Sequence, residues 1–228
     1  MRLSIIIPVL NEAEELPGLL GHLALRCGCD SEVIVVDGES EDGSQQIASQ
    51  MGALVICGER GRARQMNAGA SAARGDALLF LHADTRLPST AQQAIEIAIQ
   101  RGGGVRRDVW GRFDVCITGR PFMLRVIAAL MNWRSRLSGI ATGDQAMFMT
   151  RRAYEAAGGF PDQPLMEDVE LSRRLLALSR PVCLRDRVAT SGRRWETRGV
   201  WKTIWLMWRL RWLYWRGVPA GELAKSYR

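Results

Sequence analysis

The sequence predicts an α/β protein whose strands form one doubly wound, mostly parallel sheet flanked by helices. Short β-branched runs at residues 3–9 and 32–37 are apolar almost throughout, as expected for strands buried on both faces of a sheet. Residues 12–25, between them, carry leucines at helical spacing. Strand and helix patterns continue to alternate beyond this unit, which is typical of a doubly wound sheet.

The other elements follow from the same periodicities and from glycine breaks. Gly102, Gly103 and Gly104 interrupt the pattern, and we take them as the boundary between two halves of one domain at residues 1–228. We expect further helices near residues 40–51, 61–73, 88–100, 121–137 and 168–178, and further strands at residues 53–57, 76–82, 111–118 and 146–150.

The composition is that of a globular protein. A chain of 228 residues, 47% hydrophobic and 24% charged, is long enough for a substantial core and is not disordered or fibrous. No stretch approaches the roughly 18 apolar residues that cross a bilayer, and the first strand follows the amino terminus directly, so we expect a cytoplasmic protein. The cysteine spacing fits neither a zinc site nor a disulfide scaffold, and we expect reduced thiols at Cys27, Cys29, Cys57, Cys116 and Cys183.

The net charge of +7 favours anionic partners such as phosphates, nucleic acids or an acidic membrane surface. Over residues 193–228 only Glu196 and Glu222 oppose the Lys and Arg residues. An anionic partner should therefore meet the carboxyl-terminal part of the chain.

Polar residues stand at or just past the ends of three predicted strands. Asn11 and Glu12 follow the first strand, Asp37 ends the second, and Asp84 follows residues 76–82. Ligands of doubly wound sheets bind beyond the carboxyl ends of the strands, so these side chains should converge on one crevice. For Asp37 the alternative is that its loop serves only to cap the next helix.

An apolar strand that ends in His82, Ala83 and Asp84 places two potential metal ligands on one face. A hard divalent cation that is bound by few carboxylates and by substrate phosphates needs such an exposed position. The alternatives are that Asp84 caps the following turn and that His82 is a hydrogen-bonding neighbour.

Two helix starts carry charged residues suited to a substrate. Arg62, Arg64 and Asn67 begin one helix, where guanidinium groups suit a diphosphate, and the alternative is a solvated basic face. Glu167 and Asp168 begin another helix, where the macrodipole alone favours acids. A carboxylate brought into the crevice at that point would act as a general base on an acceptor hydroxyl.

Five short motifs follow one another along residues 2–178. They are Pro8-Val-Leu-Asn-Glu12, Val36-Asp-Gly-Glu-Ser40, Leu81-His-Ala-Asp84, Gly143-Asp-Gln145 and Glu167-Asp168. This ordered set resembles the family 2 glycosyltransferases, whose nucleotide-sugar fold is called GT-A. The resemblance implies a nucleotide-binding half at residues 1–101, an acceptor-binding half at 102–190 and a helical extension at 191–228.

The resemblance also implies an inverting transfer of a sugar from a UDP- or GDP-linked donor to an acceptor hydroxyl. Asp168 would be the base, with Glu167 beside it, and Asp84 would hold Mg²⁺ or Mn²⁺ on the diphosphate. The implied nucleotide-sugar-binding residues are Pro8, Leu10, Asn11, Glu12, Asp37, Arg64, Asn67, His82 and Asp84. The implied acceptor-binding residues are Gly143, Asp144, Gln145, Arg194 and Trp195.

Two positions depart from the family pattern. His82 stands where the usual acid-x-acid motif has its first acid, which affects metal affinity and donor choice. Leu10 stands where many members have a tyrosine, which removes a stacking contact to the base. Arg194 and Trp195 resemble the Arg-Trp element of processive members, although the Gln of that element is absent.

The carboxyl-terminal region predicts a helix with two apolar faces. Five tryptophans spaced by 4, 3, 4 and 3 form one stripe: Trp201, Trp205, Trp208, Trp212 and Trp215. Lys202, Arg209 and Arg216 flank the stripe on one side and Arg211 on the other, whereas Leu206, Leu210 and Leu213 lie opposite. We expect the leucines to pack on the domain and the tryptophans to contact the inner face of the membrane, near a lipid-linked acceptor. The alternatives are burial in the core or in a homodimer interface.

Other functions fit the sequence less well. A sugar nucleotidyltransferase, a dinucleotide oxidoreductase or a P-loop enzyme would need a glycine-rich loop after the first strand, where this chain has residues 8–12. A basic module that binds a membrane or a nucleic acid without catalysis would leave the ordered acids unexplained. We therefore expect an enzyme that has no nucleic-acid partner.

Overall fold

The structure is a computed structural model and describes residues 1–26, 28 and 30–227. The strands are β1 (Leu3–Val9), β2 (Ser31–Asp37), β3 (Leu54–Cys57), β4 (Ala77–Phe80), β5 (Thr85–Arg86), β6 (Trp110–Thr118), β7 (Met147–Thr150) and β8 (Val182–Ser191). The helices are α1 (Leu16–Arg26), α2 (Ser44–Gln50), α3 (Arg62–Ala72), α4 (Ala91–Arg101), α5 (Met123–Ser138), the 3₁₀ turn η1 (Gly143–Gln145), α6 (Arg151–Ala156), α7 (Glu167–Leu176), α8 (Arg193–Arg198), α9 (Val200–Trp215) and α10 (Ala220–Tyr227).

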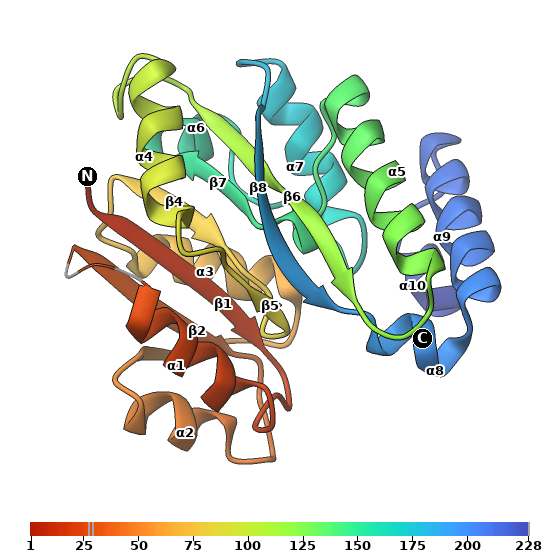
Figure 1. The fold of residues 1–228 in the computed structure, drawn as a ribbon, viewed down its shortest axis with the longest axis horizontal. Coiled ribbons are helices and arrows are strands. Elements are labelled where there is room, and N and C mark those ends of the chain that lie inside the picture. The colour runs from red at the N-terminus through yellow and green to blue at the C-terminus, as the bar shows by residue number, and fades with distance from the viewer. Residues whose placement is uncertain (27, 29, 228) are drawn as a thin grey trace.

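The described strands form one sheet in the order β3-β2-β1-β4-β7-β6-β8-β5 (Figure 1). β1 pairs in parallel with β2 and β4, and β2 pairs in parallel with β3. β7 runs antiparallel to both β4 and β6, and β6 pairs in parallel with β8. The prediction of an α/β fold with a mostly parallel sheet is confirmed.

The leucine face of α9 packs on the domain, as predicted. Leu210 is 1% exposed and forms a buried cluster with Met166 and Leu223, against which Leu206 and Leu213 also pack. All five tryptophans of the stripe are exposed, from 56% at Trp212 to 81% at Trp215. The alternative in which this helix is buried in the core is therefore wrong.

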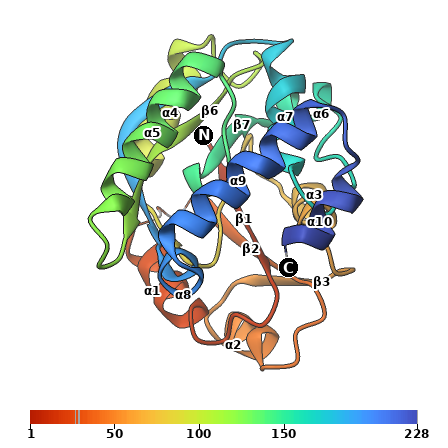
Figure 2. The same cartoon turned by 90° about the vertical axis from the view of Figure 1, so that its right-hand side faces the viewer.

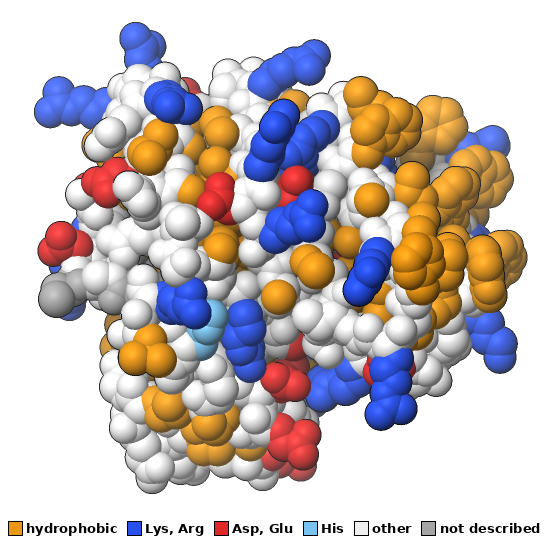
Figure 3. Space-filling view, viewed as in Figure 1, with side chains coloured by type: hydrophobic (Ala, Val, Ile, Leu, Met, Phe, Trp, Pro, Cys, Tyr) orange, Lys and Arg blue, Asp and Glu red, His pale blue; other side chains and the backbone are white. Residues whose placement is uncertain are grey.

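Helix α5 lies beside α9 in two perpendicular views (Figures 1 and 2). It also exposes large apolar side chains, including Leu130, Trp133 and Leu137, and Phe122 is exposed just before its first residue. Figure 3 shows hydrophobic side chains gathered over these two helices. We call the exposed apolar side chains of α5 and α9, with Phe122, the apolar face.

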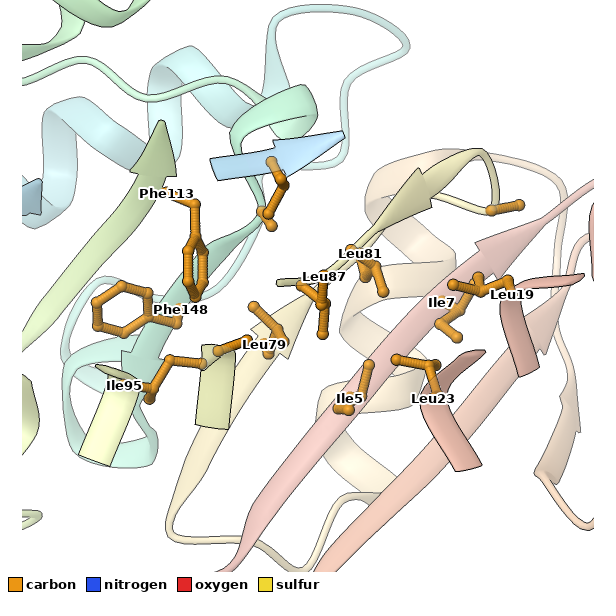
Figure 4. Packing of buried hydrophobic residues seen from close by; sticks show 14 of the residues in the cluster. Ile5, Ile7, Leu19, Leu23, Leu79, Leu81, Leu87, Ile95, Phe113 and Phe148 are labelled. Carbon is orange, nitrogen blue, oxygen red and sulfur yellow. The ribbon is translucent and has the colours of Figure 1, made fainter. Parts of the chain in front are cut away.

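The sheet is covered by helices on both sides because successive residues of its central strands point to opposite faces. Ile5 and Ile7 of β1 belong to a cluster formed with α1, α2, α4 and α5. Ile6, between them, belongs to a second cluster formed with α3, α6 and α7. Figure 4 shows the first cluster, in which Leu19 and Leu23 lie against β1.

Three differences from the predicted elements have local causes. The sequence analysis placed no strand at β8, where Arg185, Asp186 and Arg187 break the apolar pattern and the strand is only partly buried. The first predicted helix begins at Leu16 instead of residue 12. The second begins at Ser44 instead of residue 40, because the preceding loop bonds to Asp37.

The described cysteines Cys57, Cys116 and Cys183 are free thiols, as expected, whereas Cys27 and Cys29 lie outside the described residues. Within residues 1–26, 28 and 30–227, none of the helices combines the length and the apolar character needed to cross a bilayer.

Candidate functional site

A pocket of about 310 Å³ opens beyond the carboxyl end of β4. Its walls come from the segment after β4, the turn η1, the start of α7, the end of β8 and the three carboxyl-terminal helices. The predicted site residues that line it are His82, Asp84, Gly143, Asp144, Glu167, Asp168, Arg194 and Trp195. The structure therefore brings the predicted metal ligand, base and acceptor residues together in one cavity.

The start of α7 is set by an unusual backbone conformation. Met166, which caps the helix, has a φ of 63°, in the left-handed region that non-glycine residues rarely adopt. Its side chain is buried against Leu210 and Leu223, which stabilises this conformation. The chain consequently turns sharply, and the next two residues, Glu167 and Asp168, line the pocket.

The Asp168 carboxylate is held by two backbone N–H donors. Gly143 N–H donates to Oδ2 at 2.8 Å and Val169 N–H donates to Oδ1 at 2.7 Å. A carboxylate has about four lone-pair positions, so two such bonds orient the group and leave capacity for a substrate proton. The Asp168 carboxylate is thus held in the pocket in a fixed orientation.

Glu167 is only 4% exposed, and its Oε1 lies 3.6 Å from Nη1 of Arg62. Burial raises the pKa of Glu167, the charge of Asp168 raises it further, and Arg62 lowers it in part. Burial lowers the pKa of Arg62, but attraction to Glu167, Asp168, Asp144 and Asp84 outweighs this effect and leaves it above the ordinary value. Arg62 is therefore a cation that faces the acids of the pocket.

His82 and Asp144 form a pair across the pocket, with His82 Nδ1 3.5 Å from Asp144 Oδ1. Burial raises the pKa of Asp144, but the hydrogen bond and charge of His82, with the charges of Arg62 and Arg194, lower it below its ordinary value overall. Asp144 is consequently favoured in its charged form. This pairing corresponds to the alternative in which His82 is a hydrogen-bonding neighbour.

The Asp84 carboxylate has weak protein partners. Its Oδ1 accepts from the hydroxyls of Thr85 at 3.3 Å and Thr190 at 3.4 Å. Within the described parts of the chain, no three His, Cys, Asp or Glu residues are grouped so that they could hold a metal ion by themselves. Mg²⁺ and Mn²⁺ bind commonly through one or two carboxylates, with substrate phosphates completing the shell. The donor set around Asp84 fits a cation of this kind.

On the other side of Asp84, the loops after β1 and β2 are tied together. Asn11 N–H donates to Ser40 Oγ at 2.8 Å, and Asn11 Oδ1 accepts from the N–H of Glu41 at 2.9 Å. Burial raises the pKa of Glu12, Arg193 lowers it, and Asp84 raises it, which places Glu12 within the electrostatic reach of the pocket. Pro8 and Leu10 are half-buried at the end of β1.

Asp37 is completely buried at the end of β2. Its Oδ2 accepts from Ser40 N–H at 2.9 Å and from Gln45 Nε2 at 2.7 Å. Its Oδ1 has no hydrogen-bond partner within the described chain. A buried carboxylate oxygen without a donor is costly, so this atom is an acceptor suited to a ligand N–H or hydroxyl.

Two predicted donor-binding residues have partners outside the pocket. Arg64 Nε donates to Asp162 at 2.9 Å, and its Nη1 lies 2.7 Å from Glu59. Asn67 donates to the carbonyl of Phe160 at 2.8 Å and accepts from the Phe160 N–H at 2.9 Å. Both side chains thus hold the loop that precedes α7, whereas Arg62 of the same helix lines the pocket.

Among the predicted acceptor residues, Gln145 is completely buried and forms a capping box with Thr142 inside η1. It supports the turn that presents Gly143 and does not itself line the pocket. The Arg194 guanidinium lies 4.2 Å from the ring centre of Tyr227 on α10. Arg194 thereby joins α8 to α10 at the pocket wall.

Arg211 and Tyr227 also line the pocket, and neither was predicted to be a site residue. The signal for Arg211 was its position on the opposite flank of the tryptophan stripe from the other cations of α9. A residue on that flank turns towards the domain when the tryptophans face outwards. For Tyr227 there was no comparable pattern.

Residues 4–155 match the protein family described as Glycosyl transferase family 2. A curated relative, the undecaprenyl-phosphate 4-deoxy-4-formamido-L-arabinose transferase of Pseudomonas fluorescens (strain SBW25), is 31% identical over 149 residues, which cover 60% of this chain and 40% of that protein. A PGL/p-HBAD biosynthesis glycosyltransferase of Mycobacterium tuberculosis (strain ATCC 25177 / H37Ra) is 40% identical over 91 residues, 37% of this chain and 36% of that protein. The chain thus spans less than half the length of these relatives.

Solved structures share the fold at low sequence identity. TarS from S. aureus (residues 1–349), in complex with UDP, superposes with a TM-score of 0.67 at 20% identity, covering 84% of this chain and 60% of that one. A mannosyltransferase from Pyrobaculum calidifontis, in complex with GDP-Man and Mn²⁺, superposes with a TM-score of 0.61 at 21% identity, covering 82% and 56%. Both likenesses concern the fold.

Proposed function

The chain belongs to glycosyltransferase family 2, and on that premise we propose that it transfers a sugar, with inversion, from a UDP- or GDP-linked donor to an acceptor hydroxyl. The observation that carries the proposal is the presence of Asp84 and Asp168 in one pocket, the first with weak protein partners and the second held by two N–H donors. The UDP and GDP-Man complexes of structures with the same fold support a nucleotide-sugar donor.

Asp168 is the proposed base. It takes the proton of the acceptor hydroxyl while that oxygen forms a bond to the anomeric carbon of the sugar. The bond from this carbon to the diphosphate oxygen breaks, and the nucleoside diphosphate leaves with the electron pair. A single in-line displacement of this kind inverts the anomeric configuration. Glu167, with its raised pKa, is the neighbour that keeps Arg62 in place.

The donor diphosphate is proposed to lie between Asp84 and the cations of the pocket. Mg²⁺ or Mn²⁺, when bound at Asp84, supplies positive charge that stabilises the leaving diphosphate. Arg62 and Arg194 supply further positive charge on the Asp84 side, since both feel the Asp84 charge. His82 is proposed to lie at the edge of this site, where Asp144 holds its ring in place.

The nucleoside is proposed to occupy the loops after β1 and β2, in contact with Pro8, Leu10, Asn11 and Glu12. The unpartnered Oδ1 of Asp37 supports this proposal, because a base N–H or a ribose hydroxyl would satisfy it. Arg64 and Asn67 are proposed to support the donor site indirectly, by holding the loop that precedes α7.

The acceptor is proposed to be lipid-linked, and the apolar face is proposed to rest on the inner, cytoplasmic surface of a membrane. The name of the Pseudomonas relative indicates a polyprenyl-phosphate acceptor for that protein. In this chain, two cations lie over exposed tryptophan rings of α9. The guanidinium of Arg209 is 5.5 Å from the ring centre of Trp205, and that of Arg216 is 5.3 Å from the ring centre of Trp212. Aromatic and cationic side chains on one exposed helix suit an anionic lipid surface.

Calorimetric titration with UDP, GDP and their sugars, with and without Mn²⁺, tests the donor proposal. We expect metal-dependent binding of one nucleotide class to the wild type and its loss in Asp84→Ala. Asp30→Ala, in the loop at the opposite end of β2, is the matched control and should bind like the wild type. Absence of binding for every nucleotide, with and without the metal, would overturn the proposed function.

A further inference from the structure

Two cations near the pocket lack counter-charges. The Nε and Nη2 atoms of Arg134, on α5, are buried and have no hydrogen-bond partner within the described chain. Arg211, on α9, lines the pocket. In the part of the chain that the structure describes, neither guanidinium has a carboxylate within the 4.0 Å of an ion pair. By contrast Arg136, two residues beyond Arg134, pairs with Asp114 at 2.8 Å.

The two cations also repel one another. Burial lowers the pKa of Arg134 to about 10, and the charge of Arg211 is the next largest cause. Burial likewise lowers the pKa of Arg211, although the charges of Asp168 and Asp144 act against it. The buried Nε and Nη2 of Arg134 are unfavourable because they have lost water without gaining a hydrogen-bond partner, and Arg211 adds a second, half-buried positive charge nearby. An anion bound between them would remove this cost.

These cations differ in position from those on the donor side. The charge of Asp84 acts on Arg62 and Arg194, and the charge of Asp168 acts on Arg62, Arg134 and Arg211. We call Arg134 and Arg211, which come from α5 and α9, the second cationic position, because Arg62 and Arg194 come from α3 and α8. The charge of Asp84 is not among the causes that shift the pKa of either Arg134 or Arg211.

The second cationic position also lies directly beneath the apolar face. Arg134 follows Trp133 on α5, and Arg211 precedes Trp212 on α9, and these tryptophans are 63% and 56% exposed. The two helices run side by side (Figure 2). On each helix an exposed aromatic ring is therefore next in sequence to a less exposed guanidinium.

We propose that Arg134 and Arg211 bind a phosphate group carried by the acceptor, at the Asp168 end of the pocket. The inference rests on the proposed function and specifies its acceptor class. Guanidinium groups bind phosphate through directed, charge-assisted hydrogen bonds, and a phosphate supplies enough acceptor oxygens for the two unpartnered N–H groups of Arg134 and for Arg211. The phosphate belongs either to a lipid headgroup or to a soluble phosphorylated acceptor.

Calorimetric titration with two probes, inorganic phosphate and n-hexyl phosphate, tests the proposal on the full chain. We expect binding to weaken about tenfold or more in Arg211→Gln and in Arg134→Gln, as for loss of a charge-assisted hydrogen bond. Arg209→Gln, on the exposed side of α9, should keep the wild-type affinity for hexyl phosphate, and Arg62→Gln, on the donor side, should weaken it less than either Arg134→Gln or Arg211→Gln. Tighter binding of hexyl phosphate than of inorganic phosphate would indicate a lipid source, and equal binding a soluble one.

Three results would overturn the inference: no binding of either probe to the wild type, unchanged affinity in Arg211→Gln, or loss confined to Arg62→Gln. Both glutamine variants should melt at or above the wild-type temperature, because each removes an unpaired buried charge, so a lost signal is not a failure to fold. Metal-dependent nucleotide binding should persist in Arg211→Gln. That result separates failure of the acceptor site from failure of the proposed function.

Discussion

The backbone N–H of Gly143 donates a 2.8 Å hydrogen bond to Oδ2 of Asp168, joining two segments that are 25 residues apart in sequence. A Cβ added at Gly143 would collide with the imidazole of His82. The absence of a side chain at Gly143 therefore allows the turn η1 to lie close to two groups. One is Asp168, the proposed base, and the other is the segment that contains His82 and Asp84. The proposed catalytic geometry depends on this close approach.

Asp168→Asn should slow transfer by roughly 10²–10⁴-fold, the usual contribution of a general base. The asparagine oxygen can still accept from Gly143, so the pocket should keep its shape and donor affinity should not change. Radiolabelled sugar transfer measures the rate, and calorimetry measures donor binding. A variant that transfers at the wild-type rate would exclude Asp168 as the base.

Glu167→Gln should stabilise the protein increasingly as the pH rises. The folded-state pKa of Glu167 is above the ordinary value of 4.5 because of burial and of Asp168, so its charged form opposes folding. In the wild type, the contribution of Glu167 to the free energy of unfolding is fully present below pH 4.5, where the side chain is neutral. This contribution is lost as the pH rises through the raised pKa. The gain in melting temperature should therefore be absent in acid and appear towards neutral pH.

Asp144→Asn should change the stability of the protein in the opposite direction from Glu167→Gln. The pKa of Asp144 is lowered, so its charge stabilises the fold above the ordinary pKa and this contribution disappears in acid. The variant should melt below the wild type at neutral pH and approach it at low pH. The effect should be small, because the Asp144 side chain is 50% exposed. If the melting temperatures of both variants and of the wild type changed with pH in parallel, the pKa directions given for Glu167 and Asp144 would both be contradicted.

Gly111→Ala should destabilise the sheet by about 1–3 kcal/mol, the usual cost of overpacking. The new Cβ would meet the carbonyl oxygen of Val182 on β8 and would lie 2.6 Å from the ring of Phe148 on β7. Backbone on one side and a buried ring on the other leave little room for adjustment. Urea unfolding measures the change. Gly221→Ala on α10, where a new Cβ would meet no atom within 4 Å, should not destabilise the protein and should stabilise it by up to about 1 kcal/mol, because alanine has the higher helix propensity.

Replacing both Trp205 and Trp212 by Ala should reduce sedimentation with vesicles that contain anionic lipids. These rings are 65% and 56% exposed, and cations lie beside both. The double variant Leu25→Ala with Leu54→Ala removes exposed apolar groups elsewhere and should sediment like the wild type. Wild-type protein that fails to sediment but forms a dimer sensitive to the tryptophan changes would assign the apolar face to self-association.

The strands of the first half of the chain were predictable because they are buried on both faces. The runs that became β1 and β2 contain β-branched residues whose apolar pattern is almost unbroken. β8 lacks this signal, since Arg185 and Arg187 point to solvent and pairing with β6 determines its conformation. Such pairing joins segments about 70 residues apart, so the pattern of apolar residues within one segment does not reveal it.

The lining of the candidate pocket was predictable where a residue follows a strand or begins a helix next to the pocket, as for Asp84 and Asp168. It was less so within α3. Arg62 and Arg64 both stand in the first turn, and residues two apart point in very different directions around a helix. Only the orientation of α3 on the sheet turns Arg62 towards the pocket and leaves Arg64 with Asp162.

Each described strand and every fully buried member of the two sheet clusters precedes residue 192, whereas α8, α9 and α10 supply one complete wall of the pocket. The scaffold and this wall are therefore encoded by separate stretches of the gene. The residues of this wall can therefore be exchanged without altering the residues of the sheet, so the chemistry of the pocket and the fold can change independently.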